Sequence, residues 1–148
     1  MRSKAPLALM EQAVMVLVFA LAAALCLRVF VSADRLSRTN QARDTAVLQA
    51  QCAAEAVKHA GGDAGSALSG AAAALGGQYA QGLLWVDYAA DWTPSSGPDC
   101  AYRLTARGVD SGSAGLGKAL IQVSTAREDP QVLFQLETAW QEVDGHGG

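Results

Sequence analysis

The feature that most constrains this chain is an unbroken apolar run near its N-terminus. Fifteen consecutive residues, Ala13–Leu27, are apolar, and the wider segment 7–31 is nearly as apolar. A helix needs about 20 apolar residues to cross the ~30 Å hydrocarbon core of a bilayer. The run is too long for the buried core helix of a chain of 148 residues. We therefore predict one transmembrane helix over residues 7–32, preceded by a basic leader at residues 1–6.

One acidic residue, Glu11, lies near the start of this segment and is followed by Gln12. An ionised acid at the centre of a bilayer costs about 2.5–3.5 kcal/mol on insertion scales, and less near the edge. An ionisable side chain inside a membrane span usually has a function, and it usually pairs with another polar or charged group. Glu11 either extends toward the membrane interface or meets a cation on another chain.

Basic residues flank the apolar segment on both sides, so they do not by themselves fix its orientation. Arg2 and Lys4 precede it, and four arginines lie between Arg28 and Arg43. We expect the N-terminus in the cytoplasm because the leader is short and basic and the downstream part is rich in strands. A secretory signal cleaved near Ala33 is the alternative interpretation.

Beyond the apolar segment, the sequence contains no proline or glycine before Gly61 and predicts that the helix continues over residues 33–60. The alanine- and glycine-rich stretch 61–81 is expected to be a connector, either loose or with a short helix over residues 66–75. The predicted helix carries an apolar stripe that could cover another layer, formed by Leu36, Val47, Ala50, Ala54 and Val57.

From residue 82 the apolar period changes to two, which predicts strands. Short links imply an antiparallel meander, and its apolar face requires the helical stripe as cover. The predicted fold class is α+β: a long N-terminal helix, membrane-spanning in its first half, packed on a C-terminal four-stranded antiparallel sheet within residues 82–143, with a tail at 144–148. The four strands are expected within segments 82–92, 100–108, 117–128 and 131–143.

Charge and cysteine content limit the possible functions. Residues 61–148 hold ten acids and four bases, which argues against nucleic acid as a partner. Of the three cysteines, Cys26 lies in the apolar run, and no CxxC or Cys/His spacing suggests a metal site. If the C-terminal part is exported, Cys52 and Cys100 could form a disulfide; otherwise they are two buried thiols.

The sequence contains no motif typical of an enzyme. GxSxG, HExxH, P-loop and Rossmann patterns are all absent. The two histidines, His59 and His146, fall at a predicted helix end and in a glycine-rich tail. We therefore expect no catalytic residues, no cofactor and no enzymatic activity.

The order of these features resembles that of type IV pilins and of the pseudopilins of type II secretion systems. The resemblance is most specific in "PLALMEQAVMVLVFALAAALCL", and in architecture it covers nearly the whole chain. It implies a structural subunit that polymerises through its N-terminal helix with copies of itself or related subunits. It also implies partners, namely the membrane, a prepilin peptidase that removes the leader and an assembly platform. Leu7 would be the first mature residue, and Glu11, the fifth, would contact the freed amine of a neighbouring subunit.

The processing region departs from the family pattern. The family's peptidase normally cuts after glycine, sometimes alanine, and here Pro6 stands before Leu7. A cut after Ala5 would make Glu11 the sixth mature residue. The alternative to a polymerising subunit is a single-pass, membrane-anchored extracytoplasmic interaction protein that does not polymerise.

Both interpretations place the protein in the cell membrane with its C-terminal domain outside the cytoplasm, and the first also allows a surface filament. Some pseudopilins bind calcium through their outer loops. The resemblance therefore raises a calcium site as the alternative to a solvated acidic edge, formed by Asp87, Asp91 and Asp99.

Overall fold

The computed structural model describes residues 5–97 and 99–142. Most of the predicted leader and the whole predicted tail lie outside these ranges. The chain divides into two compact units, Met1–Gln41 and Ala42–Gly148. The elements are α1 (Ala5–Ala60), α2 (Ala64–Leu75), β1 (Gln78–Ala80), β2 (Leu83–Tyr88), β3 (Tyr102–Gly108), β4 (Leu116–Thr125) and β5 (Val132–Gln141).

The described part of the first unit is helical throughout. It forms the beginning of α1, and residues 6–41 are all exposed. The exposed side chains include large apolar ones, such as Phe19 at 77% and Phe30 at 73%. By length and composition, α1 is the one helix within the described ranges that could cross a membrane. A long apolar helical segment whose described side chains are all exposed suggests membrane anchoring, because such a surface is unfavourable in water.

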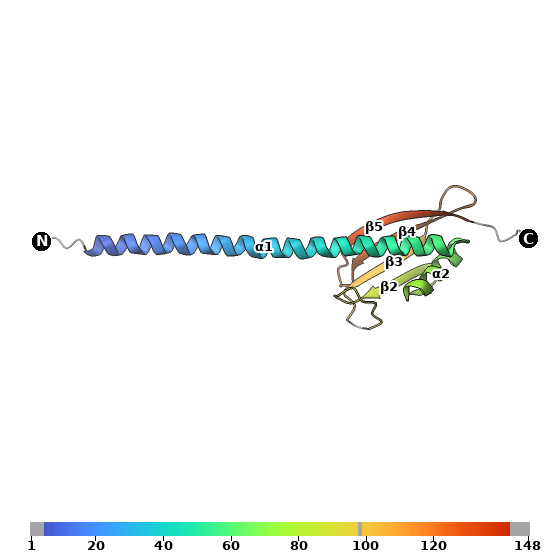
Figure 1. Cartoon of the computed structure of the whole chain (residues 1–148), viewed down its shortest axis with the longest axis horizontal. Helices are drawn as coiled ribbons and strands as arrows, with labels where there is room; N and C mark the ends of the chain where they lie inside the picture. The colour runs from blue at the N-terminus through green and yellow to red at the C-terminus, as the bar shows by residue number, and fades with distance from the viewer. Residues whose placement is uncertain (1–4, 98, 143–148) are drawn as a thin grey trace, which may run out of the picture. The chain divides into compact units, whose positions relative to one another are not determined.

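The second unit contains an antiparallel sheet of five strands in the order β1-β2-β3-β4-β5, of which β2 to β5 are labelled in Figure 1. The prediction of four strands is therefore wrong by one. The additional strand, β1, lies in the predicted connector and pairs its Tyr79 with Leu84 of β2. Gln81 and Gly82, both at positive φ (53° and 79°), form the two-residue turn between these strands. Three residues are too few to show a period of two, so only this turn could have revealed the strand.

The other four strands confirm the predicted meander and its alternation. Residues on one face are buried, including Leu104 and Ile121 at 0% exposure, while their neighbours along each strand are partly or fully exposed. Between Val123 and Ser124 the pairing of β4 with β5 shifts, as expected for a β-bulge. The meander thus presents one apolar face to the helices and one mixed face to solvent.

The buried face is covered by α2 and by the α1 segment from residue 42 to residue 60 (Figure 1). The prediction that the later part of α1 covers the sheet is confirmed, but the predicted stripe is only partly right. Val47 is half-buried and Leu36, in the first unit, is 63% exposed. Alanines dominate the real contact face, which consists of Ala46, Ala50, Ala53, Ala54 and Val57.

The predicted connector is more ordered than a loose link. Asp63 caps α2 by accepting a hydrogen bond from the Ser66 backbone N–H at 3.2 Å, and Gly76 ends the helix in the left-handed conformation. Gly77 then passes close to β2, because a Cβ there would lie 2.6 Å from the Trp85 carbonyl oxygen. The prediction of a helix over 66–75 is confirmed, with a start two residues earlier.

Candidate functional site

The first turns of α1 contain the residues that the sequence associates with processing and assembly. Ala5, Pro6 and Leu7 all belong to the helix, and proline is tolerated there because first-turn amides lack helical acceptors. The Leu7 side chain is 74% exposed. Glu11 lies four residues later, so it projects from the same side of the helix as Leu7. The structure therefore places the predicted assembly residues together on one exposed surface.

Glu11 is exposed and has no hydrogen bond or ion pair with any residue in the ranges 5–97 and 99–142. The first cationic side chain after it along α1 is Arg28. At 1.5 Å per residue the two are about 25 Å apart along the helix axis, too far to pair within one helix. Within the described chain, the Glu11 carboxylate therefore has no counter-ion.

The cysteines are free thiols in the structure, and no Cys52–Cys100 disulfide is formed. Cys52 lies on α1, where its thiol interacts electrostatically with the buried Tyr88. The Cys100 thiol instead interacts with the Asp87 carboxylate. The Cys100 thiol also donates to the Tyr102 carbonyl at 3.1 Å. Cys52 is exposed and Cys100 is half-buried, so the alternative of two buried thiols is wrong for Cys52.

The three acids proposed as calcium ligands have other roles or remain apart. Asp87 accepts two hydrogen bonds from Arg103, at 2.6 Å from Nε and 3.0 Å from Nη2. Asp91 binds the backbone N–H and hydroxyl of Thr93, and Asp99 is exposed. In the portion of the chain that the structure describes, no three His, Cys, Asp or Glu residues are grouped so that they could hold a metal ion.

The Arg103 guanidinium lowers the pKa of Asp87 through these hydrogen bonds, against the opposing effect of partial burial. Burial raises the pKa of the Cys100 thiol, and the neighbouring Asp87 carboxylate raises it further. A thiol with a raised pKa is a weak nucleophile at neutral pH. The ion pair was not foreseen from the sequence, although the pairing of Asp87 with Arg103 follows once the strand register is known.

An aromatic cluster at the same end of the sheet was also missed. Trp92 stacks on Tyr102 with ring centroids 4.1 Å apart, and Tyr88 lies 5.9 Å from Trp92. Trp92 adopts φ 65°, a left-handed conformation that is unusual for a side chain of this size. The Tyr88 hydroxyl also donates to Gln49 of α1 at 3.2 Å. The cluster fixes the loop between β2 and β3 and ties the sheet to the α1 segment above it.

The histidines offer no evidence for chemistry. His59 lies in the last turn of α1 and is exposed. A cation there complements the helix dipole. His146 lies outside the described residues.

Comparison with known proteins gives no family assignment. No family model, no curated protein and no solved structure matches the chain. The architecture itself, a long apolar N-terminal helix packed on a C-terminal antiparallel sheet, is pilin-like.

Proposed function

We propose that the protein is a non-enzymatic structural subunit of a type IV pilus-like or pseudopilus assembly, which polymerises through its N-terminal apolar helix. Its partners are the membrane and copies of itself or related subunits, with a prepilin peptidase and an assembly platform acting on it. The N-terminus lies in the cytoplasm and the second unit outside the membrane. Nucleic acid is not a partner.

The observation that supports this proposal best is that Glu11, on an exposed apolar helix, has no ion-pair partner among residues 5–97 and 99–142. In lipid, a lone carboxylate is costly, whereas a carboxylate beside a cation from another molecule gains strong Coulomb attraction at low dielectric. The freed amine of a processed neighbour is such a cation. One acid per helix then fixes the stagger between subunits, as buried polar groups set register in coiled coils.

The composition of the helix suits close packing against other helices. Transmembrane helices associate through small residues that let backbones approach. Ala20 and Ala24 are four residues apart and therefore on one side of α1. Ala13 lies two turns before Ala20, on nearly the same side of the helix and closer to Glu11. These positions allow several copies to pack side by side in the membrane.

The assembly test compares Glu11→Gln with Glu11→Asp and with Gln12→Ala in the membrane-bound full chain. We expect large complexes for the native protein, for Glu11→Asp and for Gln12→Ala, and monomers for Glu11→Gln, measured by native gel electrophoresis after mild extraction and by electron microscopy. If Glu11→Gln assembles like the native protein, the proposal is wrong. A native protein that is monomeric throughout would favour the non-polymerising anchor.

Intact-mass spectrometry of the membrane-extracted protein tests processing separately. We expect an N-terminus at Leu7 or at Pro6, because the proposed ion pair joins Glu11 of one subunit to the free N-terminal amine of its neighbour. A chain that still begins at Met1 in assembled complexes would contradict the amine as the partner of Glu11.

A further inference from the structure

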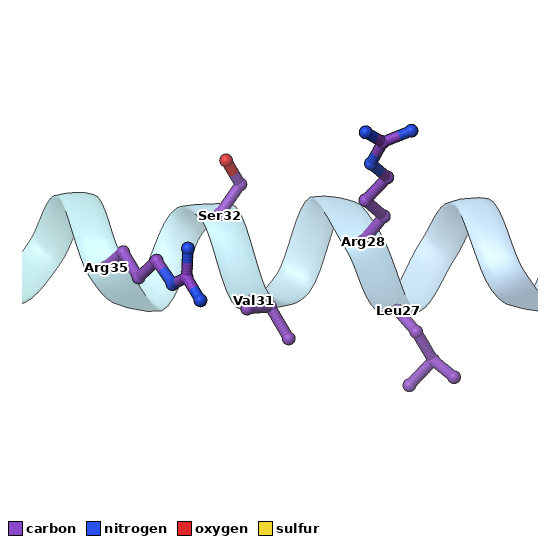
Figure 2. A pocket seen from close by; sticks show the side chains of 5 residues that line it. All are labelled: Leu27, Arg28, Val31, Ser32 and Arg35. Atoms are coloured by element: carbon purple, nitrogen blue, oxygen red, sulfur yellow. The ribbon is translucent and has the colours of Figure 1, made fainter.

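At the end of the apolar run, α1 carries a shallow hollow on its surface. Figure 2 shows the five side chains that line it: Leu27, Arg28, Val31, Ser32 and Arg35. Arg28 and Ser32 point to the same side of the helix, and Leu27 and Val31 lie together on another side (Figure 2). All five residues are exposed. Two apolar side chains and three polar ones thus border a single recess.

The two arginines of this hollow have no anionic partner in the described chain. Neither Arg28 nor Arg35 forms an ion pair with any residue in the ranges 5–97 and 99–142, whereas nearby Arg38 is held by Asp34 at 3.0 Å. Arg28 and Arg35 are two turns apart, about 10 Å along the axis, and Ser32 lies between them. Their long side chains can converge on one anion near the Ser32 hydroxyl.

The position of the hollow along α1 matches the depth of lipid headgroups. The segment from Leu7 to Leu27 is about 30 Å long as a helix, equal to the thickness of the hydrocarbon core. Arg28 and Ser32 therefore follow directly where that core ends. Leu27 and Val31, 66% and 49% exposed, lie beside them and offer contact to an acyl chain.

We propose that this hollow binds the headgroup phosphate of an anionic phospholipid, with Arg28 and Arg35 on the phosphate oxygens, the Ser32 hydroxyl donating to the same group, and Leu27 against the acyl chain. Guanidinium groups bind phosphate by paired, charge-assisted hydrogen bonds. Each arginine near an anionic membrane surface contributes about a fivefold gain in association. The bound lipid fixes the depth of the helix in the membrane whether or not the protein polymerises.

The test uses the full chain in vesicles of equimolar phosphatidylglycerol and phosphatidylcholine, with a spin label on either lipid. Electron paramagnetic resonance then measures the preference of the protein for one lipid over the other. We expect the native protein to prefer phosphatidylglycerol, and each of Arg28→Gln and Arg35→Gln to reduce that preference by up to about fivefold. Glutamine is a good helix former, so the helix is retained.

Arg43→Gln is the matched control, because it removes the same charge from an exposed position more than two turns beyond the hollow. We expect it to keep the native preference, and millimolar inorganic phosphate to leave that preference unchanged. Equal losses of preference in Arg43→Gln and Arg28→Gln would overturn the proposed site, as would no loss in the double variant Arg28→Gln/Arg35→Gln.

Competition by inorganic phosphate would show that the hollow binds a soluble anion, and it would overturn the proposal of a bound lipid. Glu11→Gln should keep the preference, which separates this test from the assembly test.

Discussion

At the residue scale, the informative positions are polar groups that the fold buries or pairs. The Thr138 side chain is 5% exposed, and its hydroxyl has no hydrogen-bond partner among the residues that the structure describes. It lies on the apolar face of β5, opposite Ala119 of β4. Trp140, two residues on, satisfies its indole N–H by donating to the Gly62 carbonyl at 2.8 Å. The sequence pattern of alternating apolar and polar residues predicts which face of the sheet Thr138 and Trp140 occupy. It does not predict whether their polar atoms find hydrogen-bond partners.

Thr138→Val should raise the free energy of unfolding by about 1 kcal/mol, because an isosteric apolar side chain removes an unsatisfied buried hydroxyl. The chain's three tryptophans, Trp85, Trp92 and Trp140, all lie in the second unit. Urea unfolding followed by tryptophan fluorescence therefore reports on that unit in the detergent-solubilised full chain. Thr105→Val, on the partly exposed face of β3, is the control and should change stability by less than about 0.5 kcal/mol. A loss of stability in Thr138→Val would contradict the assignment.

The Asp87–Arg103 ion pair makes the free energy of unfolding depend on pH. The pKa of Asp87 in the folded protein lies below its ordinary value of 3.8. The pair's contribution is therefore complete above that value and is lost as the pH falls through the lower folded pKa. Asp87→Asn should cost about 0.5–1 kcal/mol at neutral pH, since the Arg103 side chain is 49% exposed. The difference between native and variant in urea unfolding should shrink below about pH 4, and a difference constant down to strong acid would refute the role of the pair.

At the scale of elements, most of the sheet could be predicted from the sequence and the contact between α1 and the sheet only partly. Turn residues and a period of two located β2 to β5 within a few residues. The three-residue β1 was too short for such a signal. The stripe on α1 was misjudged because alanine is a good helix former on any face. Its burial at Ala46 and Ala53 depends on the sheet beneath.

A helix face made of alanine should tolerate little added volume. Ala50→Leu should destabilise the second unit by about 1–3 kcal/mol, because the site at 0% exposure has no space for three further carbons. Gln51→Leu, at the next and exposed position, is the matched control and should cost little. The same fluorescence-detected urea unfolding measures both. Equal effects at the two positions would indicate that the helix is not closely packed on the sheet.

At the scale of the whole molecule, the apolar helix was predictable because fifteen consecutive apolar residues have few alternatives. The positions of Leu7 and Glu11, the proposed assembly residues, were also predictable, since a helix places them on one side. The hollow around Arg28 and Arg35 was seen in the sequence only as flanking charge. It was recognised only in the structure, because five side chains border one hollow and neither arginine forms an ion pair with a described residue.

Removing the first unit should leave the second one folded. A chain that begins at Ala42 retains the core, since every buried residue that the structure describes lies in the unit Ala42–Gly148. We expect it to be soluble without detergent and to unfold in urea with one cooperative transition, whereas the full chain needs detergent. Aggregation of the shortened chain, or loss of its tryptophan transition, would show that the second unit depends on the first.

The separation into two units also determines what happens to a damaged molecule. Heat or a core mutation acts on the packed sheet of the second unit, whereas the proposed lipid contacts come from exposed side chains of the first unit. Under the proposed anchoring, a molecule whose second unit has unfolded would therefore keep those contacts and stay in the membrane.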